Sequence, residues 1–225
     1  MDKQLIHIHI PKTGGWSLQN TLIDYGVLNF QHEHKYATEI IDDIGLESFN
    51  NGFKFTIVRN PWDRLLSSYT FVTKGSDVIQ HYGGTRPPEY VIFDRLGIKS
   101  FNDFIYKLRD INQNKDDVYI TSITPNTSHQ FQKLEKDSNG LTLNQTKWVL
   151  DENGNRLVDY VGYLHKLEES IDELNKLTGL NIPIPPKGNV TKHVKYTEAY
   201  TPETRDIVAK LYEKDIKEFN FVFGE

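Results

Sequence analysis

Residues 5–17 read LIHIHIPKTGGWS, and this stretch decides the fold. Apolar residues at alternate positions predict a buried strand over 5–10, with the isoleucines on one face and the two histidines on the other. A loop with one lysine and two glycines follows, and then a predicted helix over 17–25. A strand, a loop and a helix in this order bring backbone N–H groups and the positive end of a helix dipole to one point. The stretch therefore predicts a site for a nucleotide or another phosphate ester.

The loop differs from the usual P-loop in the position of its lysine. In that motif the lysine follows the second glycine and precedes serine or threonine, whereas here Lys12 precedes Gly14 and Gly15. Lys12 supplies a mobile positive charge, and the glycines let the backbone approach a ligand without a Cβ in the way. We therefore expect an anion site of a different kind from that of ordinary ATPases.

The composition is that of an ordinary globular protein. The 225 residues are 37% hydrophobic and 25% charged, without repeats or an apolar run long enough to cross a bilayer. The first residues are typical of neither a signal peptide nor a transit peptide, and the absence of cysteine excludes disulfides and thiolate metal sites. We expect a single cytoplasmic domain over residues 1–225, with no membrane partner and no predicted oligomeric state.

The net charge of −5 limits the partners. A negative chain does not attract nucleic acid or a highly sulfated polymer over long range, so no nucleic-acid partner is expected. An anionic ligand must then be held by a local cluster of cations. The charge balance therefore disfavours a heavily charged polysaccharide as a substrate.

Strand and helix signals alternate along the first part of the chain. Beyond the first helix we expect a short strand at 27–31, a helix at 37–49, a strand at 53–58, and a helix that opens at Pro61, because proline suits the first turn. This alternation predicts an α/β fold with a mainly parallel central sheet flanked by helices. Ligands of such sheets bind at the carboxyl ends of the strands.

The second part of the chain gives more varied signals. Residues 73–98 hold paired glycines and prolines and predict a long surface segment, while residues 137–161 contain signals typical of a β-hairpin with its turn at 151–155. Three further helices are expected, at 100–111, at 166–178, and from Pro202 with Thr201 as its N-cap.

A second anion-binding signal follows the strand at 53–58. Residues 55–69 read FTIVRNPWDRLLSSY, with Arg59 at the strand end and Ser67 about two helical turns further on. A guanidinium offers a planar fork suited to phosphate oxygens, and a serine hydroxyl bonds the same group. The alternative is a structural pair between Arg59 and Asp63, with Ser67 an ordinary helix residue. Two anion sites after two strands of one sheet favour the functional interpretation.

The two motifs together resemble the sulfotransferase family related to Golgi carbohydrate sulfotransferases, and most closely its bacterial cytosolic members. They are Pro-Lys-Thr-Gly-Gly-x-Ser at 11–17 and Val-Arg-Asn-Pro-Trp-Asp-Arg-Leu-x-Ser-x-Tyr at 58–69. Weaker likeness continues over 144–162 and 185–223. The resemblance implies a P-loop-like three-layer fold, and it leaves 73–130 as a variable region expected on the acceptor side.

The resemblance also implies the activity. Members transfer a sulfuryl group from 3′-phosphoadenosine 5′-phosphosulfate (PAPS) to a hydroxyl, here expected on a saccharide or small molecule, by in-line displacement and without a metal. The first loop cradles the 5′-phosphosulfate, Arg59 and Ser67 grip the 3′-phosphate, and Lys12 neutralises charge on the bridging oxygen as the S–O bond breaks. The cofactor-binding residues implied in this way are Lys12, Thr13, Gly14, Gly15, Trp16, Ser17, Arg59, Ser67 and Lys192. For Lys192, in a proline-rich loop, a solvated charged surface is the alternative.

A catalytic base is expected just after the predicted second strand. Sulfuryl transfer to a hydroxyl requires removal of the acceptor proton, for which histidine is the natural acceptor near neutral pH. Bacterial relatives carry a histidine followed by a small helix, similar to residues 34–40, which implies His34. His32 and Glu33 are the alternatives.

The strand histidines suggest a second chemistry. His7 and His9 share a face and resemble a metal pair, but no third ligand has suitable spacing. We therefore expect no metal, and we expect His9 to pack or hydrogen-bond near the loop.

Two positions depart from the family's pattern. Trp16 stands where a small polar residue is usual, so either one hydroxyl contact to the phosphosulfate is missing or the indole lines the adenine or acceptor side. Residues 162–167 read GYLHKL where the family commonly has Gly-Arg-Phe-Glu-x-Leu, so any role of that glutamate is not carried over.

Two other functions stay open at this point. A nucleotide kinase-like phosphotransferase is disfavoured by the order of lysine and glycines and by the lack of an evident magnesium carboxylate after a strand. A non-catalytic 3′-phosphonucleotide-binding module is the other alternative, with Trp16 as the mark of an altered loop.

Overall fold

A computed structural model of the chain describes residues 4–28, 34–74, 93–94, 96–113, 144–187 and 194–225. The chain divides into two compact units, Met1–Arg59 with Gln145–Asn189, and Asn60–Asn144 with Val190–Glu225. Each unit has a hydrophobic core of its own. The expectation of a single domain over 1–225 stays a prediction.

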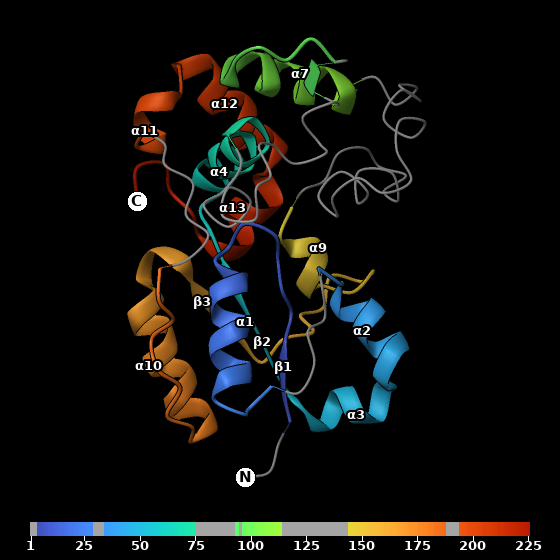
Figure 1. The fold of residues 1–225 in the computed structure, drawn as a ribbon. Helices are drawn as coiled ribbons and strands as arrows, with labels where there is room; N and C mark the ends of the chain where they lie inside the picture. Colours follow the sequence, from blue (N-terminus) through green and yellow to red (C-terminus); the bar gives the residue numbers. More distant parts are fainter. Residues whose placement is uncertain (1–3, 29–33, 75–92, 95, 114–143, 188–193) are drawn as a thin grey trace. The chain divides into compact units, whose positions relative to one another are not determined.

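A three-stranded parallel sheet forms the centre of the first unit (Figure 1). Strand β2 (Phe53–Val58) lies in the middle, between β1 (Leu5–His7) and β3 (Tyr160–Tyr163). Both neighbours run parallel to it, so the carboxyl ends of all three strands meet at one edge. The predicted α/β fold with a parallel sheet flanked by helices is confirmed.

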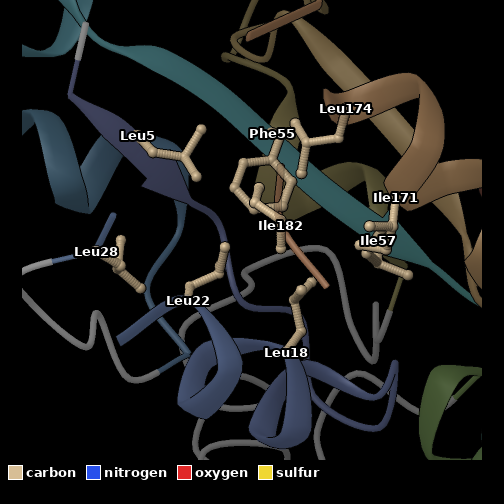
Figure 2. Close-up of a cluster of buried hydrophobic side chains, with 9 residues drawn as sticks. All are labelled: Leu5, Leu18, Leu22, Leu28, Phe55, Ile57, Ile171, Leu174 and Ile182. Atoms are coloured by element: carbon tan, nitrogen blue, oxygen red, sulfur yellow. The ribbon is translucent and has the colours of Figure 1, made fainter. Parts of the chain in front are cut away.

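Helices α1 (Gly15–Asp24) and α10 (Leu167–Thr178) pack against the sheet through one apolar core. Phe55 and Ile57 alternate along β2 and therefore point to the same side, where they are almost fully buried. Figure 2 shows them surrounded by leucines and isoleucines of the two helices. The cluster consists of Leu5, Leu18, Leu22, Leu28, Phe55, Ile57, Ile171, Leu174 and Ile182.

The predicted helix at 37–49 forms as two helices. They are α2 (Ala37–Ile44) and α3 (Leu46–Asn51), and Gly45 between them has φ 82°, a left-handed value that ends a helix. The first strand is also shorter than expected, although residues 5–10 are all buried and the N–H of Ile8 still bonds to the carbonyl of Phe55 at 2.9 Å. Of the strand expected at 27–31, residues 27–28 are not in a strand and 29–31 lie outside the described residues.

The β-hairpin predicted within 137–161 forms only around its turn, and its expected strands do not pair. Residues Thr146–Val149 form a short helix, α9, whose Trp148 is completely buried, and β3 pairs in parallel with β2 instead. β-Propensity is weak compared with burial, and here the packing of the indole decides the local conformation. The expected turn does form, because Leu150 and Arg156 make an antiparallel bridge around it.

The second unit is built from helices in the residues described. They are α4 (Pro61–Lys74), α7 (Phe101–Gln113), α11 (Tyr196–Ala199), α12 (Pro202–Leu211) and α13 (Glu213–Phe219). Its core is rich in aromatic side chains, and Trp62 lies near its centre. The indole donates to the carbonyl of Arg205 at 3.0 Å, while the Tyr200 hydroxyl donates to the carbonyl of Trp62 at 2.8 Å. These bonds tie α4 to the segments before and within α12.

Most helix predictions are confirmed. Helix α4 begins at Pro61, α10 ends before Gly179, which has φ 73°, and α12 begins at Pro202. The surface segment expected at 73–98 is not confirmed where it is described, because residues 73–74 belong to α4 and Phe93 is buried in the core. Residues 75–92 and 95 lie outside the described part. No helix in the described part of the chain is long and apolar enough to span a membrane.

The N-cap of α12 makes a measurable contribution to stability. The Thr201 hydroxyl accepts a hydrogen bond from the N–H of Thr204 at 3.2 Å. Replacing Thr201 by alanine leaves that N–H without this acceptor and should cost about 1 kcal/mol. Thermal unfolding followed by circular dichroism should show a lower Tm for Thr201→Ala and a nearly native Tm for Thr201→Ser, which keeps the oxygen. Equal losses in the two variants would contradict the capping role.

Candidate active site

The loop at the carboxyl end of β1 carries Lys12 and leads into helix α1. Lys12 has φ 66°, a left-handed conformation that is uncommon for residues other than glycine. The Thr13 hydroxyl donates to the carbonyl of Ile10 at 2.9 Å and closes the turn. Gly14 is the N-cap of α1 and has no side chain to cap it. The loop therefore presents main-chain N–H groups at the positive end of the helix dipole.

Both glycines of the loop are held between close neighbours. A Cβ on Gly14 would lie 2.8 Å from Cδ1 of Leu164, at the start of the 3₁₀ turn Leu164–Lys166. A Cβ on Gly15 would lie 2.0 Å from Cδ2 of His9. A side chain at position 15 would clash with the His9 ring, and the φ of 81° at position 14 favours glycine, so both glycines have a structural role beside the expected approach of a ligand.

Arg59 lies one residue beyond the carboxyl end of β2 and reaches the lysine loop. Its Nη1 donates to the carbonyl oxygen of Lys12 at 3.1 Å. Its main chain is bonded to the side-chain amide of Gln145 through both the N–H and the carbonyl, each at 2.8 Å. The structure thus joins the two motifs that the sequence presents as separate anion sites.

Burial, and secondarily the charge of Arg59, lower the pKa of Lys12 from 10.5 to about 7. The buried ammonium of Lys12 is poorly hydrated, and the charge of Arg59 repels it. An anion bound at the loop relieves both effects, because its charge favours the protonated lysine. The residues present therefore fit a phosphate or sulfate ester.

A row of histidine rings lies beside the loop. The His7 ring stacks on Phe55 at a centroid distance of 4.9 Å and on His9 at 5.6 Å. The ring of His9 lies 4.4 Å from that of His34. Since His9 also contacts Gly15, the row connects His34 to the lysine loop. The expectation that His9 packs near the loop is confirmed.

His9 and His34 differ in their ability to carry a proton. Burial, followed by the nearby His7, lowers the pKa of His9 to about 3. His9 is therefore neutral at physiological pH and adds no positive charge next to His34. His34 itself is only partly buried and has φ 46°, a left-handed conformation that histidine adopts more readily than most residues.

The first unit brings together most of the predicted site residues. These are Lys12, Thr13, Gly14, Gly15, Trp16, Ser17 and Arg59, with His34 reached through His9. Within α1, Ser17 is buried, whereas Trp16 is 47% exposed. Ser67 belongs to the second unit, where it is buried on α4, so its pairing with Arg59 stays a prediction. Lys192, His32 and Glu33 lie outside the described residues.

Sequence reasoning missed the parts played by Gln145 and Leu164. Gln145 lies 86 positions from Arg59 along the chain, and Leu164 is far from Gly14 in sequence. Contacts of this kind leave no local periodicity. The only signal was the likeness of residues 144–162 to the family, which marks the segment without showing what it touches.

The metal interpretation of the strand histidines gains no support. Within the described ranges, no group of three or more histidine, aspartate or glutamate side chains is placed to hold a metal ion. His7 and His9 stack on each other instead. That the reaction needs no metal stays a prediction.

Comparison with known families indicates the chemistry that this site serves. The Sulfotransferase family matches residues 1–222, which is nearly the whole chain and includes both of the predicted anion-binding motifs. A search of curated proteins found no match. The family implies a transferase that uses PAPS as its co-substrate and an acceptor for the sulfuryl group. The resemblance drawn from the two motifs is confirmed, and the chain belongs to the sulfotransferase family.

Proposed function

We propose that this protein is a PAPS-dependent O-sulfotransferase that acts on a hydroxyl of a saccharide or small-molecule acceptor. The observation that carries the proposal is the 3.1 Å hydrogen bond from Arg59 Nη1 to the carbonyl of Lys12. This bond brings the two motifs together at one edge of the sheet. A ligand with phosphate groups at both ends has to contact both motifs at once. The acceptor class rests on the net charge of −5, which disfavours a heavily sulfated polymer.

Lys12 and the first turn of α1 bind the 5′-phosphosulfate in this proposal. The main-chain N–H groups around Gly14 and Gly15 fix the anion, with Thr13, Trp16 and Ser17 forming the rest of the loop. Lys12 stabilises the negative charge that develops on the bridging oxygen as the S–O bond breaks. Because this charge is largest in the transition state, the lysine acts on the rate more than on binding.

Arg59 binds the 3′-phosphate, with Ser67 as a second contact and Lys192 in a loop over the nucleotide. The guanidinium of Arg59 is half-buried and held from its own main chain, so its planar fork is oriented before a phosphate arrives. A contact to a 3′-phosphate also distinguishes PAPS from ATP.

His34 removes the proton of the acceptor hydroxyl. The acceptor oxygen forms its bond to sulfur while the bridging S–O bond breaks, and the proton passes to the imidazole as 3′-phosphoadenosine 5′-phosphate leaves. The adjacent ring of His9 is neutral and therefore does not oppose the charge that His34 gains. His32 and Glu33 are the alternatives for this role.

A non-catalytic 3′-phosphonucleotide-binding module is the second candidate. It is favoured by Trp16, which replaces a small polar residue of the loop and is 47% exposed. Both candidates bind the nucleotide, and only the enzyme transfers sulfate.

The nucleotide preference tests the proposal directly. Calorimetry should show that 3′-phosphoadenosine 5′-phosphate binds at least about tenfold more tightly than ATP, because Arg59 meets a 3′-phosphate. Arg59→Met should remove most of this preference. Transfer of labelled sulfate from PAPS to a panel of saccharides and small alcohols then separates the enzyme from the binding module. A preference for ATP would indicate a kinase-like protein instead.

Nucleotide binding should take up a proton above neutral pH. With a Lys12 pKa of about 7, about nine-tenths of the free protein has a neutral lysine at pH 8. The bound anion raises that pKa, so binding draws about one proton from the buffer, and affinity falls as the pH rises above 7. Calorimetry at pH 8 in two buffers of different ionisation enthalpy measures the uptake. Lys12→Met should abolish it, and no uptake by the native protein would exclude Lys12 as the nucleotide's cation.

The role of His34 is best tested with asparagine. Asn tolerates the left-handed backbone of this position but does not act as a base, whereas alanine would add backbone strain. His34→Asn should lower kcat about 10²–10⁴-fold with nearly native nucleotide affinity. Added imidazole should restore part of the rate in this variant and none in Lys12→Met. A large loss of nucleotide affinity in His34→Asn would make His34 a binding residue.

A further inference from the structure

The main chain of Arg59 is held by a side chain outside the two nucleotide motifs. The register of β2 with β3 ends at the pair Val58–Tyr163, so the peptide groups of Arg59 lie one residue beyond the ladder. There the amide of Gln145 acts as a neighbouring strand would. Its Oε1 accepts from the N–H of Arg59 at 2.8 Å, and its Nε2 donates to the carbonyl of Arg59 at 2.8 Å. Gln145 is completely buried, so the two bonds are protected from water.

Gln145 is itself fixed by the hydrophobic core. Its carbonyl accepts from the N–H of Trp148 at 3.0 Å, at the start of α9, and Trp148 and Val149 are completely buried. The indole of Trp148 meets the ring of Tyr36 edge-on at 5.1 Å. Tyr36 follows His34 by two residues. One short segment therefore supports the arginine and the histidine sides of the same site.

The support reaches the lysine loop through the arginine side chain. Arg59 Nη1 bonds to the carbonyl of Lys12 at 3.1 Å, and Lys12 has the left-handed φ of 66°. The Arg59 side chain has several rotatable bonds and much conformational entropy to lose. Its guanidinium keeps a defined place only if the main chain is fixed. Gln145 provides that restraint, because its amide bonds to both the N–H and the carbonyl of Arg59.

We propose that Gln145 is a positioning residue of the nucleotide site. Its two hydrogen bonds to the Arg59 main chain orient the guanidinium toward the 3′-phosphate and, through Lys12, shape the loop. The identity of the ligand rests on the proposed function, whereas the geometry does not. Gln145 acts through Arg59, because both ends of its amide are bonded to that residue.

Methionine at position 145 removes both hydrogen bonds at similar side-chain size. In Gln145→Met we expect the affinity for 3′-phosphoadenosine 5′-phosphate to fall about tenfold or more, with little change for adenosine 5′-phosphate, which lacks the 3′-phosphate. The ratio of the two affinities is the readout, since general destabilisation does not favour one nucleotide over the other.

Asn175 provides a matched control in the same unit. Its amide makes the same pair of bonds to a main chain, accepting from the N–H of Ile182 at 2.7 Å and donating to its carbonyl at 2.9 Å. The residue belongs to the last turn of α10, and this end of the helix lies away from the lysine loop (Figure 1). Asn175→Leu should lower the Tm and leave the affinity ratio unchanged.

A double variant tests whether Gln145 acts through Arg59. Once Arg59→Met has removed the guanidinium, adding Gln145→Met should not change the affinity ratio further. Additive losses, or an equal loss for both nucleotides in Gln145→Met, would overturn the inference. If the native protein does not prefer the 3′-phosphorylated nucleotide, the proposed function fails.

The geometry can be tested without any nucleotide. The pH dependence of Lys12 labelling by acetic anhydride, read by mass spectrometry, reports the pKa of Lys12. Displacing Arg59 weakens its repulsion of the ammonium, so this pKa should rise in Gln145→Met and stay native in Asn175→Leu. An unchanged pKa in Gln145→Met would overturn the positioning role whatever the ligand is.

Discussion

Parallel pairing of β2 with both of its neighbours is the constraint on which the site depends. The pairing fixes Leu5 opposite Phe53 and Val58 opposite Tyr163, so the carboxyl ends of all three strands lie at the same edge of the sheet. Lys12 follows the first strand, Arg59 the second and Leu164 the third. Arg59 and Leu164 both contact the loop that carries Lys12, although the three residues are widely separated in sequence. A strand shifted by one residue would turn Phe55 and Ile57 out of the core, so hydrophobic burial holds this register.

Two cationic side chains, Lys12 and Arg59, lie at this edge of the sheet, where burial makes the protonated form of Lys12 unfavourable. Burial and Arg59 lower the pKa of Lys12 to about 7, which means that the folded chain disfavours the protonated lysine. The folded pKa lies below the unfolded value, so stability increases as the pH rises from about 7 toward 10.5. Such a site is preorganised for an anion, because the ligand supplies the charge that the fold lacks.

Neutral groups hold the cations in place. The glutamine amide fixes the Arg59 main chain, and the uncharged ring of His9 fills the space beside Gly15 and touches His34. A charged group in either position would change the local potential and alter the affinity for a sulfate or phosphate ester. In the function proposed above, the charged side chains of the first unit meet the ligand and the neutral ones set their geometry.

The sequence by itself determined the class of fold and the family, and it marked the two motifs that we propose bind the anion. Periodicity located the strand at 53–58, and proline and glycine marked where helices α4, α10 and α12 begin or end, because these signals depend on neighbours along the chain. The tertiary structure decided the rest. It turned the expected hairpin strand into α9, because burying Trp148 outweighs a weak β-propensity, and it placed Gln145 against Arg59 and Leu164 against Gly14. Such contacts come from packing between distant segments, which no local pattern of residues encodes.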